Sequence, residues 1–84
     1  MDQRQRFAAN LRSCRQAQGL SQEELAAGCE IHRTEVSLLE RGGREPRLEM
    51  LVKLARALDT TPEALLEGIS WLPKSRRFKI EPPR

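Results

Sequence analysis

The side chains best suited to a specific chemical task lie near the start of a predicted helix, residues 33–41. Arg33 can donate two parallel hydrogen bonds to the O6 and N7 atoms of guanine, which discriminates between bases by about 1–3 kcal/mol. Thr34 can offer its methyl group to thymine or its hydroxyl to a base or a phosphate, and Ser37 stands one turn after Arg33. These groups favour binding to nucleic acid over the making or breaking of bonds. The simpler alternative is that Arg33 is an exposed arginine on a solvated helix.

Catalytic and metal-binding chemistry find little support in the residue types. The sequence has no nucleophile beside a base, no glycine-rich phosphate loop and a single histidine, His32. Cys14 and Cys29 lie 15 positions apart without a CxxC spacing, so thiolate and imidazole ligands are too few for zinc. We therefore expect no enzyme activity, no metal and no cofactor. The two cysteines are expected to be small core residues in a reducing compartment.

The net charge is a weak indicator of the partner. It is formally +3, but residues 70–84 hold five basic side chains and one acidic side chain, which leaves the first 69 residues at −1. A domain without net charge can still bind DNA when its cations gather on one face. No stretch has the length of a membrane span, and the N-terminus is too polar for a signal peptide, so we expect a cytoplasmic protein without membrane contact.

Apolar periodicity predicts five helices that would hold the polar residues in place. Gly19 and the pair Gly42-Gly43 are expected to end the first and third helices, because glycine readily adopts the left-handed conformation of a helix C-cap. Ser21 and Glu24 match the capping box that opens a helix. The predicted helices span residues 4–18, 22–29, 33–41 and 48–58, and a fifth begins at Thr61-Pro62-Glu63 and ends at Gly68.

The end of the chain departs from the helical pattern. Phe78 and Ile80 alternate with Arg77 and Lys79, which suits a short strand. We therefore divide the chain into a helical domain, residues 4–69, and a basic C-terminal tail, residues 70–84, which forms a strand or a dimerisation arm. The predicted fold class is all-α with a short extended tail.

Small and apolar residues in the centre of the chain have the spacing of a helix-turn-helix. Ala26 is small where two helices would touch, Cys29 and Ile31 flank the turn, and Val36 and Leu39 would anchor the second helix. Such offsets also occur by chance in other helical proteins. The spacing alone therefore leaves the motif open.

A longer series of residues, in fixed order and spacing, matches a known family. The matching residues are Arg12, Arg15, Gly19-Leu20-Ser21-Gln22, Leu25-Ala26, Ile31, Val36-Ser37, Leu39-Glu40-Arg41-Gly42, Pro46, Leu51, Ala55, Leu58 and Leu65-Leu66. On these residues the stretch 11–66 resembles the Cro/phage-repressor, or XRE, family of helix-turn-helix transcriptional regulators. The resemblance implies a five-helix, lambda-repressor-like fold whose third helix enters the major groove of double-stranded DNA. Residues 32–37 also resemble, more weakly, the recognition-helix start of restriction-modification controller proteins.

The resemblance assigns roles to polar residues around the third helix. Its first residues would contact base edges, which agrees with the dimensions of the major groove. Glutamine at the start of the second helix would hold a phosphate, and a helix N-terminus aimed at phosphate is favourable on its own account. The alternatives are an ordinary first-turn residue and merely solvated loop arginines. The candidate base contacts are Arg33, Thr34 and Ser37, and the candidate phosphate contacts are Gln22, Arg41, Arg44 and Arg12.

Two further positions match a pair that the family uses structurally. The resemblance implies that Arg15 and Glu40 form a partly buried salt bridge between the first helix and the recognition helix. We therefore expect both side chains to stabilise the fold and not to contact DNA.

Three residues depart from the family pattern. Glu30 stands where the turn usually has glycine, and a left-handed non-glycine residue costs on the order of 1 kcal/mol. His32 replaces the usual serine or threonine cap, and an imidazole is expected to cap poorly. Glu35 places an acid on the predicted DNA-facing side. It would accept a hydrogen bond from cytosine N4, stabilise the helix start, or orient a neighbouring arginine, Arg33 being the nearest.

A monomer of this size would read only one half-site. Family members commonly dimerise on two half-sites about 34–36 Å apart. The predicted homodimer interface is the fifth helix with Trp71, Leu72, Phe78 and Ile80; the alternative is that the tail folds back on its own domain. We expect sequence-specific binding to double-stranded DNA and transcriptional regulation, as a repressor. The alternatives are a controller or antitoxin component, and a protein-interaction module that kept the fold without DNA binding.

Overall fold

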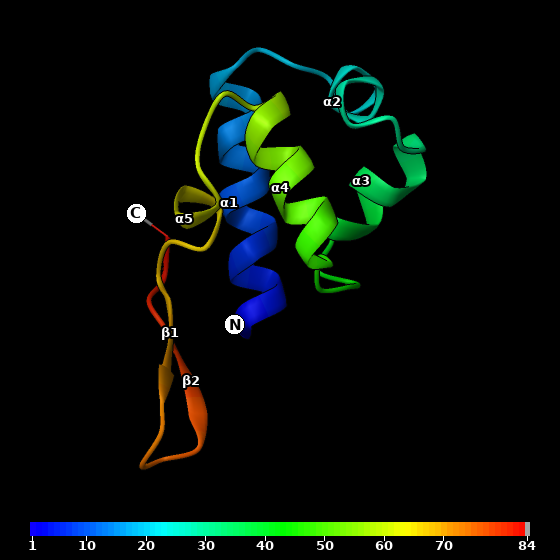
Figure 1. Cartoon of the computed structure of the whole chain (residues 1–84). Helices are drawn as coiled ribbons and strands as arrows, with labels where there is room; N and C mark the ends of the chain where they lie inside the picture. Colours follow the sequence, from blue (N-terminus) through cyan, green and yellow to red (C-terminus); the bar gives the residue numbers. More distant parts are fainter. Residues whose placement is uncertain (84) are drawn as a thin grey trace.

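Five helices followed by a two-stranded antiparallel hairpin make up residues 1–83, which are the residues that the computed structural model describes (Figure 1). No helix in this range is long and apolar enough to cross a membrane. The elements are α1 (Gln3–Ala17), α2 (Gln22–Cys29), α3 (Arg33–Glu40), α4 (Leu48–Ala57), α5 (Pro62–Leu65), β1 (Ile69–Leu72) and β2 (Arg77–Ile80).

Side-chain caps define where the helices begin. The predicted capping box of α2 is present: Ser21 Oγ accepts from Glu24 N at 3.0 Å, and Ser21 N donates to Glu24 Oε1 at 3.0 Å. A second capping box, which was not predicted, joins Asp2 and Gln5 by the same two hydrogen bonds at 2.8 and 2.9 Å. Because Asp2 caps the helix, α1 begins at Gln3, one residue earlier than predicted.

One hydrophobic core joins all five helices. Every helix contributes at least one fully buried side chain to this core. Val36 and Leu39 anchor the inner side of α3. Cys29 is buried and Cys14 half-buried, and both are free thiols. Burial raises the pKa of both thiols, which keeps them protonated and unreactive. The largest core side chains are Phe7, Leu11, Leu25, Leu39, Leu54, Leu58 and Leu65.

The predicted helical domain is present, and the tail, predicted to be extended, forms two paired strands, so the chain is mostly helical with a small sheet. β2 covers the predicted strand, whereas its partner β1 was not predicted and runs across the expected boundary between residues 69 and 70. The register pairs Ile69 with Ile80, Trp71 with Phe78, and Leu72 with Arg77. β1, with the sequence Ile-Ser-Trp-Leu, does not alternate between apolar and polar residues throughout, and it is defined by its hydrogen-bonded partner.

A polar contact beneath the hairpin sets where the strands leave the helices. Arg6 is buried, and its Nη1 donates to Asn10 Oδ1 at 2.6 Å. Asn10 Nδ2 in turn donates to the carbonyl oxygens of Leu65 and Glu67, both at 2.9 Å, at the end of α5. A Cβ atom at Gly68, where φ is +82°, would lie 2.5 Å from Arg6 Nε. Glycine is therefore required at this junction.

The turn between α2 and α3 has the predicted left-handed residue. Glu30 has φ 56° and ψ 42°, a conformation that side chains with a Cβ atom adopt at a cost. Because the cost is local, it can be removed without altering the core.

We predict that Glu30→Gly raises the free energy of unfolding by up to about 1 kcal/mol, because glycine adopts this conformation without strain. Glu30→Ala is the matched control, since it removes the carboxylate and keeps the strain. Urea unfolding of the three proteins measures the difference. Equal stability of the glycine and alanine variants would show that Glu30 is unstrained.

Candidate nucleic-acid interface

α3 is anchored on one side and open on the other. Val36 and Leu39 are 0% and 1% exposed, whereas Arg33 and Thr34 are exposed and Ser37 is half-buried. The hairpin leaves the opposite side of α1 and does not cover this helix (Figure 1). The three candidate base contacts therefore lie on a single helix, with the two foremost in solvent.

His32 caps α3 through a single backbone hydrogen bond, which is long for an amide donor. Its Nδ1 accepts from Thr34 N at 3.3 Å and lies 2.9 Å from Thr34 Oγ1. A ring nitrogen that accepts from an amide carries no proton, so we assign the Thr34 hydroxyl as the donor to it. The Thr34 oxygen is then left to accept from a partner outside the protein, and its methyl group stays free.

The carboxylate of Glu40 lies at the centre of a buried polar cluster. Arg15 binds it with two nitrogens, Nε to Oε2 at 2.6 Å and Nη2 to Oε1 at 2.9 Å. Gln22 Nε2 donates to Oε1 at 3.2 Å, and Arg12 Nε lies 3.6 Å from the same oxygen. The Glu40 side chain is 1% exposed. One carboxylate thus connects α1, α2 and α3.

The charge state of Glu40 reflects this environment. Burial alone raises its pKa, but the hydrogen bonds from Arg15 and Gln22 and the positive charges of Arg15 and Arg12 outweigh it, so the pKa lies below the ordinary value. Glu40 is therefore ionised at neutral pH.

The candidate phosphate-binding side chains differ in how strongly they already interact with other groups of the protein. Gln22 is half-buried and gives one amide proton to Glu40, whereas the Arg12 side chain is 59% exposed beside it. Arg41 is exposed, and its Nε donates to the Ser37 carbonyl at 3.3 Å. Gln22 and Arg12 thus lie at one side of α3, and Arg41 is the residue directly after the helix.

Of the alternatives considered for Glu35, pairing with a neighbouring arginine occurs, but the partner is Arg44 and not Arg33. Arg44 Nη1 lies 2.6 Å from Glu35 Oε1, and the two side chains are 54% and 30% exposed. Arg33 has no ion pair with any residue in 1–83. The loop after α3 brings Arg44 back over the side of the helix that carries Glu35, a contact across nine positions that helix periodicity does not predict.

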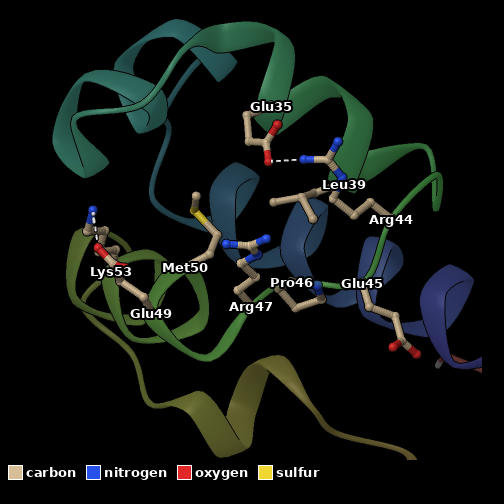
Figure 2. Close-up of a pocket in the computed structure, with 9 residues that line it drawn as sticks. All are labelled: Glu35, Leu39, Arg44, Glu45, Pro46, Arg47, Glu49, Met50 and Lys53. Atoms are coloured by element: carbon tan, nitrogen blue, oxygen red, sulfur yellow. Dashed lines mark hydrogen bonds and ion pairs between the residues drawn. The ribbon is translucent and has the colours of Figure 1, made fainter.

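The Glu35–Arg44 pair lies at the edge of a hollow between α3 and α4 (Figure 2). The hollow has a volume of about 620 Å³ and is lined by three acidic and three basic side chains. A second ion pair, Lys53 to Glu49 at 3.0 Å, lies on its α4 side. Because the charges balance, the hollow does not attract anions by itself. Its charged residues are Glu35, Glu45, Glu49, Arg44, Arg47 and Lys53.

Two short helices joined by a tight turn, with the second anchored and its outer face exposed, define a helix-turn-helix. Residues 11–65 match the helix-turn-helix family HTH_3. Because the match covers more than half of the chain, this protein belongs to the helix-turn-helix family of DNA-binding transcriptional regulators, a class of binding proteins and not of enzymes.

Several similar proteins carry more specific names. Control protein C.SmaI of Serratia marcescens is 42% identical over 66 residues, 79% of each chain. Control protein C.BamHI of Bacillus amyloliquefaciens is 44% identical over 48 residues, which are 57% of this chain and 59% of that protein, less than two thirds of its length. The crystal structure of the restriction-modification controller protein C.AhdI from Aeromonas hydrophila matches with a TM-score of 0.72 and 44% identity, over 74% of this chain and 94% of that one.

We predict that Arg15→Ala and Glu40→Ala each lower the free energy of unfolding by about 3 kcal/mol, because either leaves a buried charge without its partner. The double variant is expected to lose clearly less than the sum. Additive losses in a double-mutant cycle would show that the two side chains stabilise the fold independently.

The lowered pKa of Glu40 gives the pair a pH dependence. Its stabilisation is complete above the ordinary carboxyl pKa of 4.5 and is lost as the pH falls through the lower value of the folded state. We therefore expect the stability gap between the wild type and Glu40→Gln to be constant from pH 7 to 5 and to narrow below pH 4.5. Thermal unfolding across this range measures it.

Proposed function

We propose that this chain binds double-stranded DNA sequence-specifically and regulates transcription, with α3 in the major groove. The observation that carries the proposal is the exposure of Arg33 and Thr34 at the leading end of a helix whose other side is anchored in the core. An α-helix fits the major groove, and its N-terminal side chains reach the base edges. Within this proposal, the protein acts in the cytoplasm as a repressor or as a controller of the kind that its relatives are named for.

Base recognition is assigned to the leading turn of α3. Arg33 would bind guanine with two hydrogen bonds, because its guanidinium is exposed and free of intramolecular ion pairs within residues 1–83. Thr34 would present its methyl group to thymine, since its hydroxyl proton is directed to His32. Ser37 would follow one turn behind and reach a base or a phosphate.

Phosphate binding is assigned to the two flanks of the helix. Arg12 and Gln22 would contact the backbone on the side of Glu40, and Arg41 and Arg44 on the side of the following loop. Such contacts position the helix and supply a salt-dependent part of the affinity without reading sequence.

We further propose that two copies act together through α5 and the hairpin. In this division of the chain, residues 4–69 bind DNA and contribute α5 to the dimer, and residues 70–84 form the dimerisation arm. The exposed aromatic rings of the hairpin, Trp71 and Phe78, support this assignment. A homodimer would match a near-palindromic operator with half-sites about 34–36 Å apart.

A protein-interaction module is the second candidate function. The observation that favours it is the ion pair between Glu35 and Arg44, which places an acid on the reading side and neutralises a candidate phosphate contact. The salt dependence of binding separates the two functions, because only DNA binding releases counterions in proportion to the phosphates contacted.

Selection of bound sites from random duplexes tests the proposed function. We predict that Arg33→Ala relaxes the preference at one base position, by about 1–3 kcal/mol, and leaves the other positions unchanged. Arg56→Ala, an exposed arginine on α4, is the control and should select the wild-type sequence. Failure of the wild type to enrich any sequence would refute sequence-specific binding.

We predict that Glu35→Gln strengthens binding to all duplexes alike, by up to about fivefold, because it frees Arg44 from an exposed ion pair worth about 0.2–1 kcal/mol. Arg44→Ala should weaken binding uniformly and reduce the salt slope by about one.

Glu49→Gln is the matched control for Glu35→Gln, since Glu49 pairs with Lys53 at the same hollow on α4. A change of base preference in Glu35→Gln, without a uniform gain in affinity, would instead show that Glu35 contacts a base.

A further inference from the structure

The only histidine of the chain lies beside one of the proposed base contacts. His32 is the residue directly before α3, and both its ring and the side chain of Thr34 are exposed. The Nδ1 atom of His32 lies 2.9 Å from Thr34 Oγ1 and 3.3 Å from Thr34 N. The shorter of the two contacts joins the ring to the hydroxyl. The orientation of the Thr34 hydroxyl hydrogen therefore depends on whether this ring nitrogen carries a proton.

With a neutral ring, the Thr34 hydroxyl is an acceptor towards solvent. A neutral imidazole has one nitrogen that accepts and one that donates. The first amide hydrogens of a helix need acceptors, and Nδ1 of His32 is the atom that Thr34 N meets. Nδ1 is therefore the accepting nitrogen, and Thr34 Oγ1 donates its hydrogen to it. Only the lone pairs of the Thr34 oxygen then remain for a base.

With a protonated ring, the same contact runs in the opposite direction. Both nitrogens of an imidazolium donate. Nδ1–H of His32 then donates to Thr34 Oγ1, and the hydroxyl hydrogen of Thr34 turns outward. The amide of Thr34 loses its acceptor, but it lies at an exposed helix start where water can replace the ring. One proton on His32 thus converts the Thr34 hydroxyl from an acceptor into a donor.

An acceptor and a donor at this position fit different bases. In the major groove, adenine and cytosine present amino hydrogens, whereas guanine and thymine present keto oxygens. An accepting hydroxyl beside a free methyl group matches an A·T pair, which offers the adenine amino group and the thymine methyl group. A donating hydroxyl matches a keto oxygen instead. The charge of His32 therefore decides which kind of base Thr34 can read.

The ring of His32 is the group that titrates in the relevant range. Imidazole is the only side chain whose ordinary charge change falls between pH 5 and 8. No carboxylate within residues 1–83 lies within 4.0 Å of the ring. The charged groups around this end of α3 are Glu30 in the preceding turn, Arg33 and Glu35 on the helix, and Lys53 of α4, which acts electrostatically on Glu30.

We propose that His32 determines the base that Thr34 reads: with the neutral ring Thr34 selects an amino base, and with the protonated ring it selects a keto base. His32 is a positioning residue, because it acts through the Thr34 hydroxyl. The proposal rests on the proposed function and deepens it by assigning the chemistry of one base contact. The preferred DNA sequence then depends on pH at a single position. Arg33 keeps its preference for guanine, because a guanidinium is charged throughout this range.

Selection of bound sites from random duplexes at about pH 5 and about pH 8, the limits of imidazole titration, tests the proposal. In the wild type, the relative preference for amino and keto bases at one position is expected to change by about three- to tenfold, the value of one hydrogen bond. His32→Asn is the conservative variant, because an asparagine oxygen caps a helix and accepts at every pH. It should keep the preference found at about pH 8 under both conditions.

Thr34→Val removes the hydroxyl and keeps a branched side chain, so it should abolish the pH dependence of the preference although His32 still titrates. A wild-type preference that is identical under both conditions overturns the proposal. A loss of affinity at about pH 5 that is equal for all sequences also overturns it, because His32 then only supports the helix start. A pH-dependent preference that persists in His32→Asn or in Thr34→Val does so too. Failure of the wild type to enrich any sequence at either pH would refute the proposed function instead.

Discussion

The structure depends on one buried carboxylate. Glu40 lies at the end of α3 with its side chain 1% exposed, and its charge is compensated by groups from α1 and α2. A buried charge is costly unless it is paired in good geometry, so the three helices must meet in one relative orientation. The outer side of α3 is exposed at the angle that this contact sets. The same contact holds Gln22 and Arg12, so two candidate phosphate contacts are oriented by the residue that fixes the helix.

Sequence reasoning succeeded where the signal was local. Apolar periodicity and the Ser21 capping box gave the helices, and the resemblance identified the positions of Arg15 and Glu40 before their contact was visible. It failed where a contact depends on the path of a loop or on tertiary pairing. Arg44 reaches Glu35 because the loop after α3 turns back, and β1 exists only because β2 lies beside it. His32 occupies the cap position that the sequence indicated, and its one hydrogen bond from Thr34 N, at 3.3 Å, is long.

Acidic and basic side chains largely balance one another beside α3, which limits the electrostatic attraction to DNA there. The hollow beside α3 balances its acids and bases, and Glu35 occupies Arg44. The excess of positive charge lies in the tail, on and after the hairpin. In the proposed function, non-specific attraction to phosphate would therefore be modest near α3, and discrimination between sequences would depend on the few exposed groups of its first turn.

The junction at Gly68 gives α1 control over the direction of the hairpin. The backbone there lies directly on the Arg6 guanidinium, and a Cβ atom would come within 2.5 Å of it. In a dimer held by the hairpins, this angle determines how far apart the two reading helices stand. A change at a glycine remote from DNA would then leave the preferred half-site intact and alter the number of base pairs between the two halves. Operator geometry and operator sequence would be encoded in different parts of the chain, and each could change without the other.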